Sequence, residues 1–157
     1  MKRKELLAIA EQFSEYDVRF SDAGESFEII NPFGKEPIRV FVENDPQTPY
    51  MVCFSFQHRH LATTDEAIAY TGDILGGNVF AIEFFKDGRN RFGCDLNAQE
   101  LRDLSYTALA QRMGCYGDTK LIDYADSFKV RGWGEDTDFD AVFVTDEQGY
   151  MTIQKCT

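Results

Sequence analysis

Hydrophobic positions recur with a period of two in several stretches of the chain, which is the pattern of half-buried β-strands. Strands are predicted over residues 26–30, 38–43, 50–57, 79–86, 89–95, 139–145 and 150–156. In the third stretch, Tyr50, Val52, Phe54 and Phe56 share the more apolar face, which is therefore assigned to the core. The turn sequences Asp87-Gly88 and Glu147-Gln148-Gly149 separate neighbouring strands and predict two β-hairpins.

Helical spacing and capping residues predict helices between these strands. Leu6, Ile9, Ala10 and Phe13 recur at helical spacing and predict an amphipathic helix over about residues 2–15. Capping-box pairs, Thr63 with Glu66 and Asn97 with Glu100, predict the starts of two further helices, and a shorter helix is expected within residues 118–127. Because tight turns join successive strands, the chain is predicted to be α+β, a mainly antiparallel sheet with three to four helices packed on it.

Length and charge narrow the possible partners. A chain of 157 residues fits a single domain, and we expect one α+β domain over residues 1–157. The formal net charge is −11, from 16 Lys and Arg against 27 Asp and Glu. Such a chain repels nucleic acid and anionic membranes, and it attracts a basic protein partner. The alternative is that the acidity serves solubility alone.

The spacing of the cysteines and the lack of a long apolar segment indicate the cellular compartment that we expect for this chain. Cys53, Cys94, Cys115 and Cys156 lie far apart, without the Cys-x-x-Cys pairs of zinc ribbons or thioredoxin-like motifs. The sequence has no apolar signal core and no run of 18 apolar residues. We therefore expect a cytoplasmic protein with reduced thiols, as a monomer or homodimer.

The run Gln57-His58-Arg59-His60 holds both histidines of the chain. If the preceding strand continues, His58 and His60 extend its core face. Histidine is the commonest metal ligand as well as a frequent acid or base. The candidate site consists of this pair with a carboxylate from Asp65, Glu83 or Asp95, and a divalent metal is the one cofactor considered. The favoured alternative is structural, with His58 capping the core and His60 helping to turn the chain.

Motifs that indicate a specific enzyme are absent from the sequence. It has neither a Gly-x-Ser-x-Gly elbow nor a Walker loop. Cys94 beside Asp95 is a conceivable nucleophile and base, but its alternation with apolar neighbours favours a small core residue. Glu83 interrupts an apolar strand and needs a partner, for which Arg39, Arg91 and Arg131 are candidates. These features favour a protein without catalytic activity.

The single tryptophan precedes a cluster of carboxylates. Trp133 lies between two glycines and is followed by Glu135, Asp136, Asp138 and Asp140. An exposed Trp beside acidic residues suits an interface with a basic protein, because Trp is enriched among residues that dominate binding energy. The alternative is a buried Trp that anchors a loop, with a solvated acidic turn beyond it.

A series of short motifs extends over about a third of the chain. They are Phe54, His58 and His60, then Asp65-Glu66-Ala67-Ile68-Ala69, Ile74-Leu75, Glu83-Phe84-Phe85, Asp87-Gly88 and Gly93. In this series the chain resembles a group of small bacterial proteins of unknown function. Where many members have an aromatic residue before the first His, this chain has Gln57. The resemblance implies a strand–helix–hairpin unit. It also implies a similarity to immunity proteins that accompany bacterial toxins.

The sequence is compatible with three functions. The leading one is a non-enzymatic, acidic module that binds a protein, as an inhibitor or immunity-like protein. The second is an enzyme or a small-ligand or metal-binding protein built around His58 and His60. The third is a structural module that self-associates through an edge strand such as residues 150–156.

Overall fold

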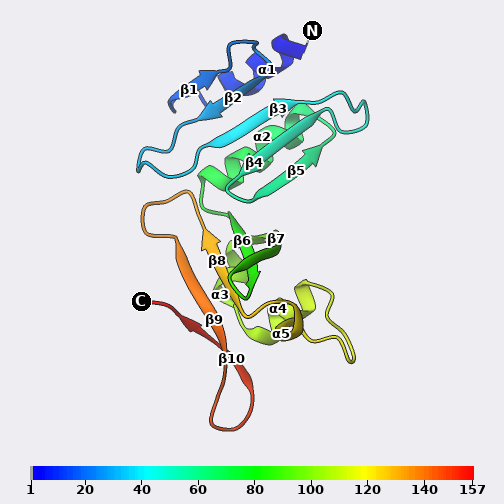
Figure 1. Ribbon diagram of the computed structural model, residues 1–157. Helices are drawn as coiled ribbons and strands as arrows, with labels where there is room; N and C mark the ends of the chain where they lie inside the picture. The colour runs from blue at the N-terminus through cyan, green and yellow to red at the C-terminus, as the bar shows by residue number, and fades with distance from the viewer. Residues whose placement is uncertain (1) are drawn as a thin grey trace.

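The computed structural model describes residues 2–157 and contains two five-stranded antiparallel sheets, one above the other in Figure 1. The expected α+β class and antiparallel pairing are confirmed. The single expected sheet is instead two sheets, and the described residues form five helices rather than three to four. In the part of the chain that the structure describes, no helix is long and apolar enough to span a bilayer.

The first sheet is a meander with two helices on one face. Its order is β1-β2-β3-β4-β5, and every neighbouring pair is antiparallel. Helices α1 and α2 pack against strands of this sheet and against each other. The elements are α1 (Lys2–Glu11), β1 (Val18–Phe20), β2 (Ser26–Ile29), β3 (Ile38–Val42), β4 (Tyr50–Phe54), β5 (Gln57–Leu61) and α2 (Thr64–Leu75).

The second sheet has the order β10-β9-β8-β6-β7, so β8 returns to pair with β6 after three short helices. Strands β1, β5 and β8 are additions to the strands predicted from sequence. The expected hairpins are present as β6–β7 and β9–β10. The elements are β6 (Val79–Lys86), β7 (Arg89–Asn97), α3 (Ala98–Arg102), α4 (Tyr106–Arg112), α5 (Leu121–Tyr124), β8 (Ser127–Arg131), β9 (Phe139–Thr145) and β10 (Met151–Lys155).

The capping box predicted at Asn97 forms in full, and the one predicted at Thr63 forms in part, because Glu66 reaches back to Ala62 rather than to Thr63. The Glu66 backbone N–H donates to the Thr63 hydroxyl at 3.1 Å, and the Glu66 carboxylate accepts from the backbone N–H of Ala62 at 2.8 Å. At α3, the backbone N–H of Glu100 donates to the Asn97 side chain at 2.8 Å, and the Glu100 carboxylate accepts from the Asn97 N–H at 3.0 Å. Both helices therefore begin where their sequences predict, because these side chains satisfy amides that have no partner within the helix.

The strand predicted over residues 50–57 is wrong at its end. Strand β4 stops at Phe54, which pairs with Gln57 across a two-residue turn of Ser55 and Phe56. Ser55 has φ +55°, and Phe56 is 56 % exposed rather than on the core face. A two-residue turn makes Phe54 and Gln57 neighbours on one face, so the face assigned to every later residue is reversed.

The buried hydrophobic residues form two clusters, and the first extends beyond its own sheet. One cluster lies between the first sheet and helices α1 and α2. The other lies between the second sheet and helices α3 to α5. Ala81 of β6 and Trp133, which follows β8, belong to the first cluster. Apolar packing therefore joins the two sheets at this junction.

Candidate functional site

The histidine pair lies on the outer face of β5, which is an edge strand of the first sheet. His58 is opposite Cys53 and His60 is opposite Met51, and the two rings meet edge to face with centroids 5.2 Å apart. Both histidines are exposed, so the expectation that they continue the core face is wrong. The pair therefore faces away from the first hydrophobic core.

The carboxylate that contacts this pair was not among the candidates. Glu43 Oε2 lies 2.7 Å from Nδ1 of His60. Sequence analysis missed Glu43 because it follows β3, and only the sheet brings that region next to β5. Asp65 is exposed on α2, whereas Glu83 and Asp95 are buried in the second sheet. Among residues 2–157 no group of three or more His, Cys, Asp or Glu side chains is arranged to hold a metal ion.

Asp95 is the centre of a polar network between the two sheets. Its Oδ2 accepts a hydrogen bond from the Tyr70 hydroxyl at 2.9 Å and lies 3.0 Å from the Arg59 guanidinium. Its Oδ1 lies 3.4 Å from Arg112, and Arg59 also lies over the Tyr70 ring, 4.7 Å from the centroid. Burial, together with the neighbouring Asp95 charge, raises the pKa of Tyr70. This network links β5, α2, β7 and α4, so Asp95 has structural partners rather than a metal site.

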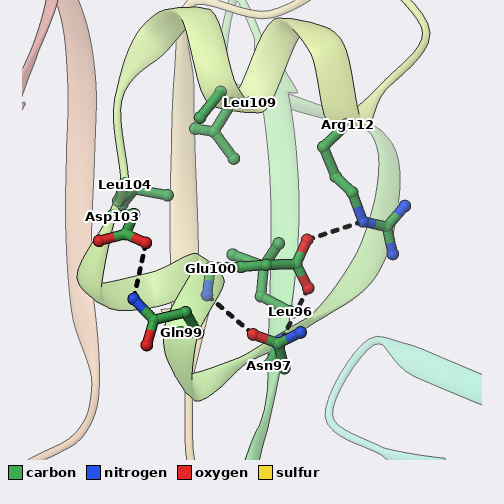
Figure 2. A pocket seen from close by; sticks show the side chains of 9 residues that line it. Leu96, Asn97, Gln99, Glu100, Asp103, Leu104, Leu109 and Arg112 are labelled. Carbon is green, nitrogen blue, oxygen red and sulfur yellow. Dashed lines mark hydrogen bonds and ion pairs between the residues drawn. The ribbon is translucent and has the colours of Figure 1, made fainter.

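A cavity of about 250 Å³ lies under the α3–α4 connection (Figure 2). Glu100 accepts from the Asn97 backbone and pairs with Arg112 at 3.1 Å, while Gln99 donates to Asp103 at 2.7 Å. The polar side chains around this cavity therefore satisfy one another, which favours a structural role. The lining residues are Leu96, Asn97, Gln99, Glu100, Asp103, Leu104, Ala108, Leu109 and Arg112.

Glu83 is a buried carboxyl with an incomplete set of partners. It is 4 % exposed, and its Oε1 accepts a hydrogen bond from Asn90. Its Oε2 has no partner among the described residues, and no arginine there forms an ion pair with it. Burial raises the pKa of Glu83, although Asn90, Lys129 and Arg131 act in the opposite direction. The predicted arginine partner is therefore wrong, since Arg131 pairs with Asp140 instead, at 2.9 Å.

We expect Glu83→Gln to stabilise the fold at neutral pH by about 1–2 kcal/mol, because it removes a buried charge while keeping an acceptor for Asn90. A raised carboxyl pKa means that the folded state holds the proton more tightly than the unfolded state. The stability contributed by protonated Glu83 is therefore present at low pH and lost as pH rises through the folded-state pKa. Urea unfolding at pH 4 and pH 8 should show the gain only at pH 8. An equal gain at both values contradicts this explanation.

Cys94 has the environment of a core residue. Its side chain is partly buried against the second cluster, and its Sγ lies 3.7 Å from the sulfur of Met113. Burial raises the pKa of this thiol to about 11. Since the thiolate is the reactive form, this environment disfavours a nucleophile at neutral pH and supports the core interpretation.

Trp133 is buried, which agrees with its interpretation as a loop anchor rather than as an exposed interface residue. It is 5 % exposed, and its ring packs against Phe54 of β4 with centroids 6.4 Å apart. Its backbone carbonyl accepts a hydrogen bond from the side chain of Asn31 at 3.0 Å. Trp133 therefore anchors the β8–β9 loop to the first sheet, and it is not itself exposed to a partner.

Lys35 also fastens this loop, and sequence analysis did not identify it. Its ammonium donates to the carbonyls of Gly132 and Gly134, both at 2.6 Å, and lies 2.8 Å from Asp138 Oδ1. Gly34-Lys35 has the composition of a simple turn, and the carbonyls that it meets lie about a hundred residues further along the chain. No local signal in the sequence indicates this contact.

The tip of the β8–β9 loop presents charge to solvent. Glu135 and Asp136 are exposed, and neither carboxylate has an ion pair or hydrogen bond within residues 2–157. Asp138 and Asp140, by contrast, are held by Lys35 and Arg131. The predicted acidic stretch therefore divides into a fixed base and an exposed acidic tip.

A cleft of about 330 Å³ lies where this loop, the β2–β3 connection and the β4–β5 turn meet. We call it the junction cleft. Two exposed aromatic residues belong to the segments around it, Phe33 at 49 % and Phe56 at 56 % exposure. The lining residues are Gly34, Lys35, Glu36, Phe54, Ser55, Phe56, Arg131, Gly132 and Asp138.

Comparisons with protein-family models, with curated proteins and with solved structures found no match to this chain. The resemblance to immunity-like bacterial proteins therefore stays a prediction.

Proposed function

We propose that this protein is a non-enzymatic module that binds a basic protein through the β8–β9 loop. The observation that carries the proposal is the exposed acidic pair Glu135 and Asp136, on a loop whose base is fixed by Trp133 and Lys35. An inhibitor or immunity-like protein directed at a basic toxin is the narrower form of the proposal, and it draws on the resemblance alone.

A fixed acidic loop has two advantages in binding a basic protein. Long-range attraction between a chain of net charge −11 and a cationic partner accelerates their encounter. A loop already held in place loses little conformational freedom on binding, so more of the interaction energy remains as affinity. The exposed rings of Phe33 and Phe56, in segments that meet the base of this loop, offer apolar contact area as well.

The test is capture of partners from a lysate of the source organism, with elution by salt and identification by mass spectrometry. The wild-type chain is compared with a Glu135→Lys/Asp136→Lys variant. A matched control, Asp118→Lys/Glu147→Lys, changes net charge equally at exposed positions outside the loop. We expect the wild type and the control to retain a stoichiometric basic protein and the loop variant to lose at least about tenfold in affinity.

Two outcomes contradict the proposal. If the loop variant captures the same protein as well as the wild type does, the β8–β9 loop is not the contact surface. If both charge-reversed variants lose the partner equally, the attraction depends on net charge rather than on this loop.

A further inference from the structure

Phe56 is presented to solvent by a turn with an unfavourable backbone conformation. Ser55 precedes it with φ +55°, in the region that favours glycine and costs other residues on the order of 1 kcal/mol or more. Positive φ at the first position of a two-residue hairpin turn but not at the second is the type II′ arrangement, in which glycine is usual. Both residues line the junction cleft, and the ring is 56 % exposed. The cleft thus has an aromatic face available to a ligand.

One carboxylate of the junction cleft is free to bind a cation. The cleft lining carries Glu36 and Asp138 against Lys35 and Arg131, and Asp138 is paired with Lys35 at 2.8 Å. The Glu36 carboxylate is exposed at the cleft and has no hydrogen bond or ion pair with any residue the structure describes. An incoming cation therefore finds at least one carboxylate with no competing partner.

The cations already in the cleft are paired with carboxylates of the protein. An ammonium group has three donors, and Lys35 directs its own to two carbonyls and to Asp138. Arg131 donates through its Nη1 to Asp140 and to the carbonyls of Val130 and Phe139. The charges of Lys35 and Arg131 are thus offset by Asp138 and Asp140, whereas the charge of Glu36 is not offset by a partner.

We propose that the junction cleft receives an arginine side chain of the partner, held between the Phe56 ring and the Glu36 carboxylate. A guanidinium stacks on an aromatic face and pairs with a carboxylate at the same time, and arginine does both better than lysine. A volume of about 330 Å³ is at the small end for ligand sites, which suits one side chain rather than a larger element. This inference rests on the proposed binding of a basic protein and specifies how part of that partner is recognised.

The test is a titration of the isotope-labelled full chain with Nα-acetyl-arginine amide, followed by backbone amide NMR signals. Nα-acetyl-citrulline amide, which has nearly the same shape without the charge, is the control ligand. We expect saturable shifts at residues 34–36 and 55–57, with citrulline binding at least about fivefold more weakly. Phe56→Leu and Glu36→Gln should each weaken arginine binding about two- to fivefold. The control variants Phe20→Leu and Glu147→Gln alter exposed residues outside the cleft lining and should leave it unchanged.

Several results overturn this inference. Equal shifts from citrulline, shifts that lie outside the cleft, or binding unaffected by both cleft variants each exclude an arginine site here. The capture experiment distinguishes the two proposals. A partner lost by the Glu135→Lys/Asp136→Lys variant but retained fully by a Phe56→Leu/Glu36→Gln variant leaves the proposed function standing and removes the cleft from it.

Discussion

Trp133→Ala should lower the free energy of unfolding by about 3–5 kcal/mol, the range for truncating a buried aromatic residue. The ring is 5 % exposed and packs on Phe54, so its removal leaves a cavity where the two sheets meet. The total stability of a domain is typically on the order of 5–15 kcal/mol, so this single change removes a large share of it.

The measurement is urea unfolding followed by far-ultraviolet circular dichroism, because the variant has lost the only tryptophan. Trp133→Phe keeps an aromatic ring and should cost less than the alanine change. Phe33→Ala, at a position that is 49 % exposed, should stay within about 0.5 kcal/mol of the wild type. A loss below about 1 kcal/mol for Trp133→Ala shows that the two sheets do not depend on this contact.

Local signals in the sequence predicted the elements well. Thr63 and Asn97 each accept a hydrogen bond from the backbone N–H three residues later, so both cap their helices as expected. The Asp87-Gly88 turn likewise joins two adjacent strands, β6 and β7. Such features depend on neighbours along the chain, so the sequence is sufficient to specify them.

The sequence did not indicate which distant strands pair with each other. Period two shows that a segment is a strand but not which strand lies beside it, so two sheets were predicted as one. Strand β8 pairs with β6 after a helical insertion, although Phe128 and Val130 do alternate with polar residues in the sequence. This strand has only five residues and begins soon after a short helix, so its alternation is too brief to predict a strand.

In the candidate site, too, local features could be predicted from the sequence, whereas contacts between distant segments could not. The acidic stretch is visible in the sequence, and the structure shows that Glu135 and Asp136 form its exposed part. The histidine pair was assigned to the wrong face because a two-residue turn after Phe54 reverses the alternation. Lys35 was missed altogether, since its carbonyl partners approach only through the tertiary fold.

Asp95→Ala should cost about 2–3 kcal/mol, the second-largest effect that we expect, because it leaves several polar groups without a partner. Asp95 is 9 % exposed, and it accepts from the Tyr70 hydroxyl and pairs with Arg59 and Arg112. Both arginines are partly solvated, at 49 % and 40 % side-chain exposure, so water recovers part of their loss. The buried Tyr70 hydroxyl has less access to water and accounts for much of the penalty.

One further variant separates charge from hydrogen bonding in this network, and a second, outside the network, is a surface control. Asp95→Asn keeps an acceptor for Tyr70 but removes the charge that faces the arginines, so its cost should lie between those of the wild type and Asp95→Ala. Glu28→Ala breaks the Arg39–Glu28 pair, in which both side chains are exposed, and should change stability by no more than about 0.5 kcal/mol. Urea unfolding should show the largest loss of unfolding free energy for Asp95→Ala, a smaller loss for Asp95→Asn and the smallest for Glu28→Ala. If Asp95→Ala is as mild as Glu28→Ala, the contacts of Asp95 do not hold the two sheets together, and the junction depends on other contacts, such as those of Trp133 and Lys35.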